Sequence, residues 1–248
     1  MGKLQPTFSI ITVTFNAEKF LERTILSVLA QIYPRIEYIL VDGASKDGTL
    51  AIVENYAPRI DKWVSEPDAG LYDAMNKGMK MASGDYICFL NAGDSFYEPE
   101  TLQKMVGSIQ SQSELPDVLY GHTALVDELG HFKRMRRLAP PEKLTWKSFK
   151  QGMLVCHQAF FAKRTIAVDF DLKFRFSADQ DWCIRIMKKA KNLYNTHLTL
   201  IQYLDEGMST RNRRASLKER FQIMVRHYGW FSTIIHHFWF IIRAVVKK

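Results

Sequence analysis

The strongest constraint on the fold is an alternation, in the first hundred residues, between short apolar runs and segments of helical periodicity. FSIITVTF (8–15), IEYILVD (36–42) and DYICFL (85–90) are rich in β-branched and aromatic residues, which is typical of buried strands. DKWVS (61–65) predicts a further short strand. Long apolar strands of this kind suit a parallel sheet, because both faces of such a sheet are covered.

Between these runs, apolar residues recur every three or four positions and give each segment one apolar helical face. The first segment follows Asn16, the expected N-cap, and the second covers about 49–56. The third is lined by Leu71, Met75 and Met79, and we expect both methionines in the core. The order β-α-β-α-β-α-β predicts a Rossmann-like, mostly parallel sheet with helices on both faces.

The pattern changes in the second half of the chain. DVLYGHTALVD and HFKRMRR flank ELG and predict a hairpin, hence a small antiparallel portion of the fold. SADQDWCIRIMKK opens a helix, and from Arg211 onward the chain reads as a basic and then aromatic helical tail. The fold class is therefore α/β with a helical C-terminal extension.

The net charge of the chain narrows the class of binding partner. The net charge of +8 favours anionic partners, such as phosphorylated small molecules, anionic lipid or nucleic acid. Nucleic acid is not expected, because the basic residues are spread along the chain and form no recognisable motif.

The three cysteines have no paired spacing, which indicates a reducing compartment. We expect no signal peptide, and no stretch reaches the about 20 apolar residues that a spanning helix needs.

Acidic and polar residues follow the predicted strands or begin a helix. Asp42 follows YILV, the stretch Asn91 to Asp94 follows YICFL, and Asp179 with Asp181 follows FRFS. The first two groups emerge at one edge if the sheet is parallel. Carboxylates there suit a Mg²⁺ or Mn²⁺ ion that is shared with substrate phosphates.

Three segments carry a family resemblance: FSIITVTFNAEKFLERTILSVLAQIYPRIEYILVDGASKDGT, DAGLYDAMNKGMKMASGDYICFLNAGD and FSADQDWCIRI. Together they resemble the family-2 nucleotide-sugar glycosyltransferases of the GT-A fold, over about residues 7–190 and in the same order. The resemblance implies an inverting, metal-dependent transfer of a sugar to a hydroxyl group.

The resemblance also implies residue roles. Asp94 takes the position of the metal ligand for Mg²⁺ or Mn²⁺, and Asp42 that of the base contact, which favours a UDP-sugar. Gly43 replaces the second carboxylate of the family pattern at the end of the second strand. Asp73, and similarly Asp68, could touch the donor or simply face solvent. The expected nucleotide-sugar site comprises Thr14, Phe15, Asn16, Asp42, Asp73, Asn91, Ala92 and Gly93.

The family's catalytic base aligns with Asp179, while Ala178 replaces the glutamate that usually precedes it. Asp181 is the second candidate. The alternative is that both acids stabilise the helix dipole, by about 0.3–1 kcal/mol each. His157 either lines the acceptor or phosphate site or is a hydrogen-bonded core histidine. Arg211 either clamps the diphosphate or lies in a solvated loop.

We expect a GT-A domain over 1–210, with a nucleotide-binding half (1–95) and an acceptor half (96–210), followed by an extension over 211–248. The tail GWFSTIIHHFWFIIRAVVKK (229–248) suits a helix in a membrane interface, or else packs on the globule or on a second copy. A membrane location favours a saccharide or polyprenyl-linked acceptor at the inner face of the cell membrane, in polysaccharide or lipopolysaccharide biosynthesis, with the protein otherwise cytoplasmic.

Two other functions remain open at this stage. A nucleotidyltransferase also pairs a nucleotide-binding α/β half with carboxylates, but it would need a Gly-rich basic loop after the first strand, and TFNAEKF has no glycine. A non-catalytic GT-A-like nucleotide-sugar-binding protein is conceivable because Gly43 and Asn91 depart from the family pattern.

Overall fold

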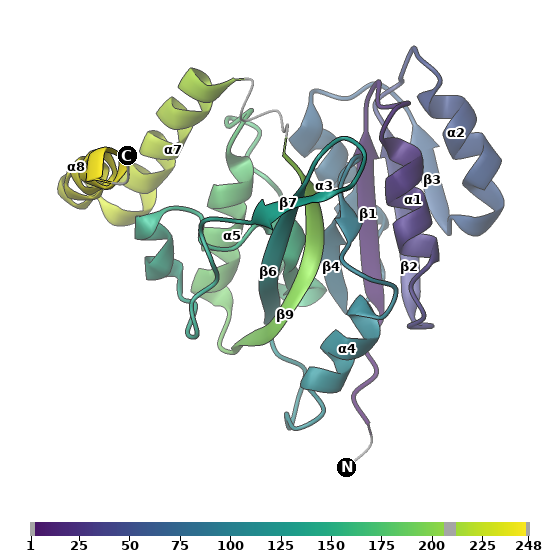
Figure 1. Cartoon of the computed structure of the whole chain (residues 1–248), viewed down its shortest axis with the longest axis horizontal. Helices are drawn as coiled ribbons and strands as arrows, with labels where there is room; N and C mark the ends of the chain where they lie inside the picture. Colours follow the sequence, from purple (N-terminus) through teal and green to yellow (C-terminus); the bar gives the residue numbers. More distant parts are fainter. Residues whose placement is uncertain (1–2, 206–211, 247–248) are drawn as a thin grey trace.

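The computed structural model describes residues 3–205 and 212–246, with side chains up to residue 240. Within that part, nine strands form one sheet in the order β3-β2-β1-β4-β8-β6-β9-β5, and β7 pairs with β6 (Figure 1). Strands from the first and second halves of the chain thus share a single sheet. The α/β fold class predicted from the sequence is confirmed.

The first four strands are those that the apolar runs predict: β1 (Phe8–Thr14), β2 (Ile36–Asp42), β3 (Lys62–Ser65) and β4 (Tyr86–Phe89). They pair in parallel, with Thr14 opposite Asp42. The register brings the carboxyl ends of these strands to one edge, the upper edge in Figure 1.

The second half adds the antiparallel pairs. The predicted hairpin is confirmed as β6 (Val118–Val126) and β7 (Phe132–Met135). β8 (Phe160–Lys163) joins β4 to β6, and the short β5 (Ser95–Phe96) pairs with β9 (Leu193–Leu204). The sequence did not predict β9, because polar residues interrupt its apolar pattern and His197 has a positive φ of 58°.

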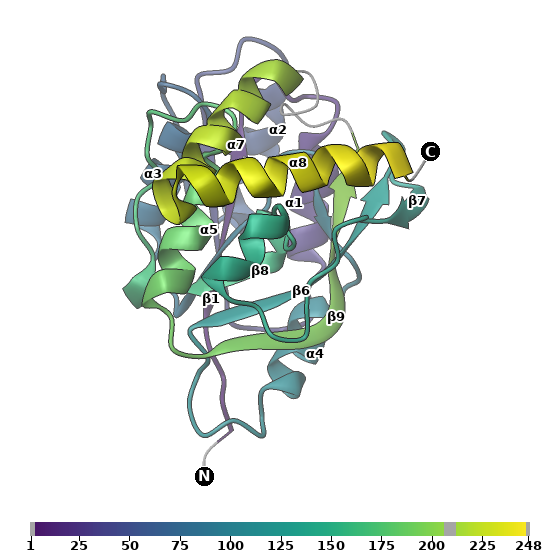
Figure 2. The same cartoon turned by 90° about the vertical axis from the view of Figure 1, so that its left-hand side faces the viewer.

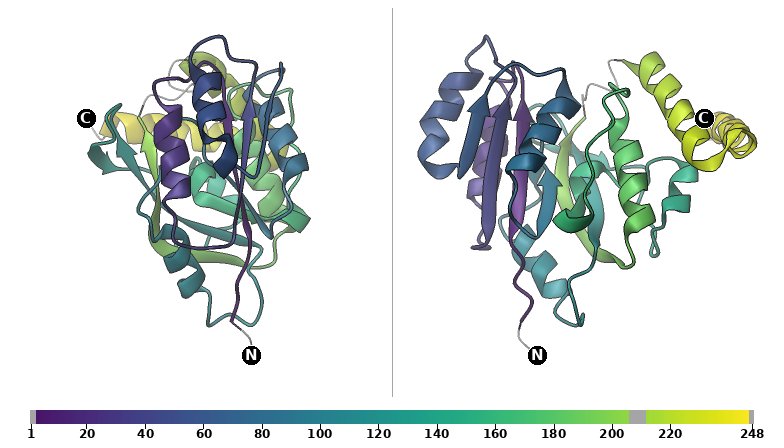
Figure 3. Two further views of the ribbon diagram at one scale, coloured as in Figure 1. Left: turned by 90° about the vertical axis from the view of Figure 1, so that its right-hand side faces the viewer. Right: turned by 180° about the vertical axis from the view of Figure 1, so that it is seen from behind.

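Helices cover both faces of the sheet. α1 lies in front of the sheet in Figure 1, whereas α3 lies in front in the reverse view of Figure 3. The predicted Asn16 cap is wrong, because α1 begins only at Leu21 and Asn16 Oδ1 accepts a hydrogen bond from the Lys46 N–H group instead. The helices are α1 (Leu21–Leu29), α2 (Thr49–Tyr56), α3 (Leu71–Met81), α4 (Thr101–Ser108), α5 (Ala178–Lys189), α7 (Arg213–Tyr228) and α8 (Trp230–Val246).

Short 3-10 turns complete the chain: η1 (Ala57–Arg59), η2 (Trp146–Gln151), η3 (His157–Ala159) and η4 (Arg164–Ile166). The core between sheet and helices contains Met75 and Met79, as predicted. The three cysteines are free and buried.

Helix α7, the first of the two helices in the C-terminal extension, packs against the segment that leads into α5. Both oxygens of the Glu219 carboxylate accept hydrogen bonds from backbone N–H groups, those of Arg175 and Phe176, at 2.8 Å each. Ser216 contacts Ser177, with 3.0 Å between their hydroxyl oxygens. The extension therefore supports the start of α5. Among residues 3–205 and 212–246, no helix combines the length and the apolar character that crossing a bilayer requires.

Glu37 of β2 joins β1, β3 and the segment that follows α3. Its carboxylate accepts hydrogen bonds from Ser9, Lys62 and Ser83, with 2.7 Å between Lys62 Nζ and Glu37 Oε1. Burial alone would raise the pKa of Glu37, but the hydrogen bonds from Lys62, Ser83 and Ser9 outweigh it and lower the pKa to about 2. The ionised form is thus favoured by folding.

We predict that Glu37→Gln destabilises the fold at neutral pH by about 2–3 kcal/mol, as expected for a pKa shift of this size. Because the pKa is lower in the folded state, this stabilisation is present above the ordinary glutamate pKa and is lost as the pH falls from about 4.5 to about 2. Urea unfolding of both proteins at pH 7 and pH 3 measures the difference. Equal losses of stability on acidification in the two proteins would contradict the prediction.

Candidate active site

The carboxyl ends of β1, β2 and β4 bring three predicted groups to one edge of the sheet. Thr14 ends β1 and Phe15 follows it, Asp42 ends β2, and the stretch from Asn91 to Asp94 comes after β4. Thr14 Oγ1 is buried and has no hydrogen-bond partner in the described structure. The predicted grouping of these residues is confirmed.

Asp42 is fully buried at this edge. Its carboxylate accepts hydrogen bonds from the Ser45 N–H group at 3.0 Å, from the Ser45 hydroxyl and from the Ser65 hydroxyl at 2.6 Å. Buried carboxylates need such partners. Asp42 therefore stabilises the loop after β2, and this does not fit the expected direct contact with a nucleotide base.

Gly43 leaves room for a different carboxylate beside the end of β2. A Cβ atom on residue 43 would lie 2.5 Å from Asp68 Oδ2 and 3.3 Å from the ring of Phe15. Phe15 is 62% exposed, and Asp68 Oδ1 accepts a hydrogen bond from the Gly70 N–H group. An exposed aromatic ring next to a carboxylate can stack on a heterocyclic base and accept a hydrogen bond from it.

The turn after β4 is held from outside by α1. Gly93 has a φ of 102°, and a Cβ there would lie 2.9 Å from Leu204. The Gly93 N–H group donates to Thr24 Oγ1, and the Arg23 guanidinium donates to the Gly93 carbonyl oxygen. Asn91 Oδ1 is buried without a hydrogen-bond partner among the described residues.

Asp94 is held from two sides. Its Oδ1 accepts a hydrogen bond from the Leu204 N–H group at 3.1 Å, and its Oδ2 accepts one from the Gln158 amide at 2.8 Å. The Cys156 thiol donates to Gln158 Oε1, which fixes the orientation of that amide. Burial raises the pKa of Asp94 to about 6, although these hydrogen bonds favour the ionised form.

Asp179 lies in the first turn of α5, and its side chain is 20% exposed. The Tyr72 hydroxyl donates to Asp179 Oδ1 at 3.2 Å, and His157 Nδ1 lies 3.3 Å from Oδ2. Burial would raise the pKa of Asp179, but His157 and Arg220 lower it, so the carboxylate is ionised at neutral pH. Burial and the Asp179 charge keep the pKa of Tyr72 well above its usual value, so Tyr72 remains a donor.

One short turn connects the two carboxylates. η3 carries His157, which contacts Asp179, and the next residue, Gln158, contacts Asp94. His157 Nε2 is buried and unpartnered in the described structure. The expectation that Asp94 and Asp179 face one shared region is consistent with this link.

Comparison with known proteins identifies the family. The model of Glycosyl transferase family 2 matches residues 9–169. The chain belongs to this family. An uncharacterized glycosyltransferase of Mycobacterium tuberculosis is 38% identical over 184 residues, which cover 73% of this chain and 68% of the relative.

One further relative and one solved structure extend the comparison. The putative teichuronic acid biosynthesis glycosyltransferase TuaG of Bacillus subtilis is 25% identical over 228 residues, which cover 89% of this chain and 88% of TuaG. The crystal structure of S. aureus TarS 1-349 in complex with UDP-GlcNAc superposes with a TM-score of 0.68 at 20% identity, and the match covers 88% of this chain and 64% of that one. The fold of this family-2 glycosyltransferase is therefore GT-A.

The residues at the expected cation site fit poorly with a metal held by Asp94. Both of its oxygens already accept hydrogen bonds, its exposed fraction is 4%, and the Arg23 guanidinium lies beside the same turn. The described residues contain no cluster of three or more His, Cys, Asp or Glu side chains that could hold an ion. Asp94 thus acts as an anchor that ties the turn after β4 to η3 and β9.

Asp181, the second candidate base, is completely buried. It accepts hydrogen bonds from Arg185 Nε at 2.6 Å and from His227 Nε2 at 2.7 Å. The expectation that Asp181 could serve as the catalytic base does not fit this environment, because the hydroxyl group of a sugar-accepting substrate cannot reach it. Instead, Asp181 joins α5 to α7.

The remaining predicted residues have local roles or lie outside the described structure. Asp73 Oδ2 accepts a hydrogen bond from the Ala69 N–H group at 3.0 Å, at the start of α3. Asn16 contacts the 45–46 loop, and Ala92 is partly buried against the core. Arg211 lies outside the described residues. Sequence reasoning did not single out Tyr72 or Gln158, because nothing in the local pattern shows which distant side chain they contact.

We predict that Asp94→Asn lowers the thermal unfolding temperature but leaves the affinity for Mn²⁺ in the presence of UDP unchanged. The reason is that both Asp94 oxygens already accept hydrogen bonds, from the Gln158 amide and the Leu204 N–H group. Differential scanning calorimetry and Mn²⁺ titration followed by electron paramagnetic resonance measure the two quantities. A Mn²⁺ affinity that is present in the wild type and lost in the variant would restore Asp94 as a metal ligand.

A second prediction concerns the nucleotide base. Asp68→Ala should weaken UDP binding by about tenfold or more, because a hydrogen bond to a charged group is lost. Asp73→Ala, on the neighbouring turn, should change the affinity much less, since Asp73 contacts the backbone of its own segment. Isothermal titration with UDP measures both. Equal effects of the two variants would remove Asp68 from the site.

Proposed function

We propose that this enzyme transfers a sugar from a nucleotide-sugar donor to a hydroxyl group of a saccharide or lipid-linked saccharide, with inversion at the anomeric carbon. The proposal rests chiefly on Asp179, an ionised and partly exposed carboxylate that Tyr72 and His157 hold in place. A carboxylate fixed in this way is suited to general-base catalysis.

The donor is proposed to bind at the carboxyl edge of β1, β2 and β4, where α/β sheets commonly bind nucleotides. Phe15 offers a stacking surface and Asp68 a hydrogen-bond acceptor. A carboxylate acceptor matches the N3–H donor of uracil, so we favour a UDP-sugar. TarS, whose fold is similar, was solved with UDP-GlcNAc, which supports the same class of donor.

The proposed reaction is a single displacement. The acceptor oxygen attacks the anomeric carbon while its proton moves to an Asp179 oxygen. The bond from the anomeric carbon to the phosphate oxygen breaks, and its electron pair leaves with the nucleoside diphosphate. Attack opposite the leaving group inverts the configuration. Tyr72 and His157 act as positioning residues in this step, because they contact the carboxylate that receives the proton.

The proposed acceptor class follows from the pathway assigned to one relative. TuaG is described as acting in teichuronic acid biosynthesis, which supports a saccharide acceptor in polysaccharide assembly. Dependence on Mg²⁺ or Mn²⁺ stays a prediction, but it no longer rests on Asp94. The polyprenyl-linked acceptor and the location at the inner membrane face also stay predictions.

We predict that Asp179→Asn lowers the turnover number by about 10²-fold or more, the usual contribution of a general base. The amide keeps the shape of the side chain and still accepts a hydrogen bond from Tyr72, so UDP affinity should not change. Transfer assays with a panel of nucleotide sugars, together with UDP titration, separate catalysis from binding.

Asp169→Asn is the matched control, because Asp169 is an exposed carboxylate ten residues before Asp179. Its turnover should equal that of the wild type. Normal turnover of Asp179→Asn would exclude Asp179 as the base. No transfer from any nucleotide sugar by the wild type, with or without divalent cations, would contradict the proposed function itself.

A further inference from the structure

Helix α8 presents one apolar face to the outside. Figure 2 shows the helix lying along the surface, with most of its length uncovered by other elements. Six large apolar side chains, spaced one and then three residues apart, are 41–80% exposed: Trp230, Phe231, Ile234, Ile235, Phe238 and Trp239. Soluble proteins rarely expose an apolar patch of this extent unless it meets a partner.

The position of α8 makes its outer face accessible to a flat surface. Figure 1 is drawn with the longest axis of the molecule horizontal, and α7 and α8 lie at one end of that axis, opposite α2 and β3. Nothing in the described structure projects beyond α8 at that end in this view. A large planar partner can therefore reach the whole apolar face.

Several lysines lie around Trp146 and Tyr228, next to the start of α8, and one of them, Lys188, has its Nζ atom 3.0 Å from His227 Nδ1. Trp146 of η2 stacks on Tyr228, whose ring lies two residues before α8, with 5.6 Å between the ring centroids. Lys188 Nζ lies 4.7 Å from the centre of the Trp146 ring, and Lys150 Nζ lies 5.5 Å from that of Tyr228. In the described structure, no carboxylate pairs with any lysine of this group: Lys143, Lys147, Lys150, Lys188 and Lys191.

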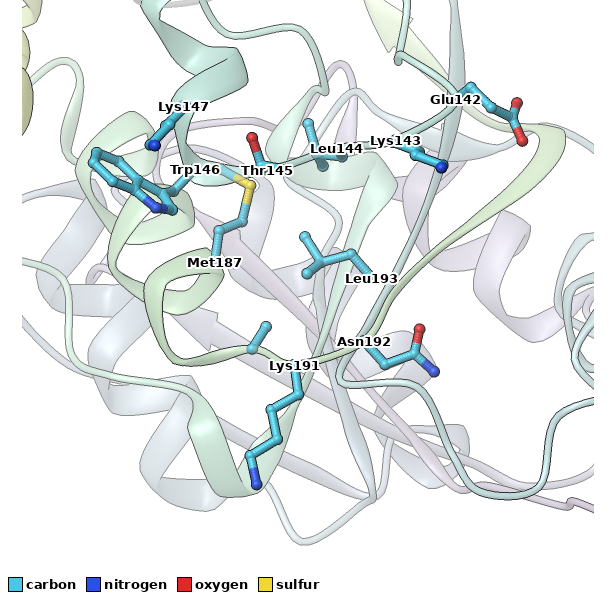
Figure 4. Close-up of a pocket in the computed structure, with 11 residues that line it drawn as sticks. Glu142, Lys143, Leu144, Thr145, Trp146, Lys147, Met187, Lys191, Asn192 and Leu193 are labelled. Carbon is cyan, nitrogen blue, oxygen red and sulfur yellow. The ribbon is translucent and has the colours of Figure 1, made fainter.

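A pocket of about 530 Å³ opens within the same lysine group (Figure 4). Lys143, Lys147 and Lys191 line it. The apolar lining comes from Leu144, Trp146, Met187 and Leu193. The one carboxylate among its lining residues, that of Glu142, lies 3.5 Å from His197 Nε2. Ammonium groups beside an apolar wall suit an anionic headgroup whose chain continues into an apolar phase.

We propose that α8 and these five lysines form a docking surface for an anionic lipid bilayer. The apolar face of α8 enters the interfacial region of the bilayer, and the lysines contact the phosphate headgroups. A second copy of the chain fits the surface less well, because its own α7–α8 region offers no free carboxylate to meet the lysines. Residues 212–240 contain a single acidic residue, Glu219, and both of its oxygens accept backbone N–H groups.

The experiment measures co-sedimentation of the full chain with vesicles of phosphatidylcholine alone and of phosphatidylcholine with one third phosphatidylglycerol. The wild type should bind the anionic vesicles more tightly, and added salt should weaken this binding. Phe231→Ser combined with Phe238→Ser should abolish binding to both. Lys147→Gln combined with Lys188→Gln should weaken binding to the anionic vesicles by about 25-fold, at about fivefold per lysine.

Leu129→Ser is the control, because Leu129 is 79% exposed but lies in the turn between β6 and β7. It should bind vesicles as the wild type does. Three results would overturn the proposal: no sedimentation of the wild type with anionic vesicles, unchanged binding of the phenylalanine variant, or a wild-type dimer in light scattering that this variant converts to a monomer. None of these readouts depends on transfer activity, so the proposal stands or falls separately from the proposed function.

Discussion

The arrangement of the candidate site depends on one buried turn, η3, whose adjacent residues satisfy two carboxylates. His157 faces Asp179, and Gln158 donates to Asp94. Carboxylates withdrawn from water require such partners, because an unpaired buried charge is very costly. By supplying both partners from consecutive residues, η3 fixes the turn after β4 relative to the start of α5. The carboxyl edge of the sheet and the candidate base are thereby connected through η3.

Burial separates the carboxylates of this edge into two groups. Asp42, Asp94 and Asp181 are nearly or completely buried, and each accepts several hydrogen bonds from the protein. They hold a loop, a turn and a helix, respectively. Asp179 and Asp68 are more accessible, and they are the carboxylates that a substrate can reach. The roles proposed for Asp179 and Asp68 therefore rest on their accessibility, while the buried carboxylates stabilise the surrounding structure.

Helix α7 connects the candidate active site with the proposed docking surface. Its first half braces the entry to α5 through Glu219 and Ser216, and its His227 reaches Asp181 inside α5. Its last residue, Tyr228, stacks on Trp146 just before α8 begins. Helix α7 thus links α8, the proposed docking helix, to α5, the helix that carries Asp179. Docking at α8 would hold the candidate site at a fixed orientation toward the docked surface.

The sequence by itself determined the strands β1 to β4, the helices between them, the β6–β7 hairpin and the grouping of Thr14, Asp42 and Asn91 at one edge. These follow from local periodicity and from the parallel arrangement that such periodicity requires. Tertiary structure alone decided which carboxylates are enclosed, that Asp68 approaches Gly43, and that Tyr72 and His157 meet Asp179. The physical reason is that the burial and partners of a charged side chain depend on segments distant in the chain, and no local pattern encodes these contacts.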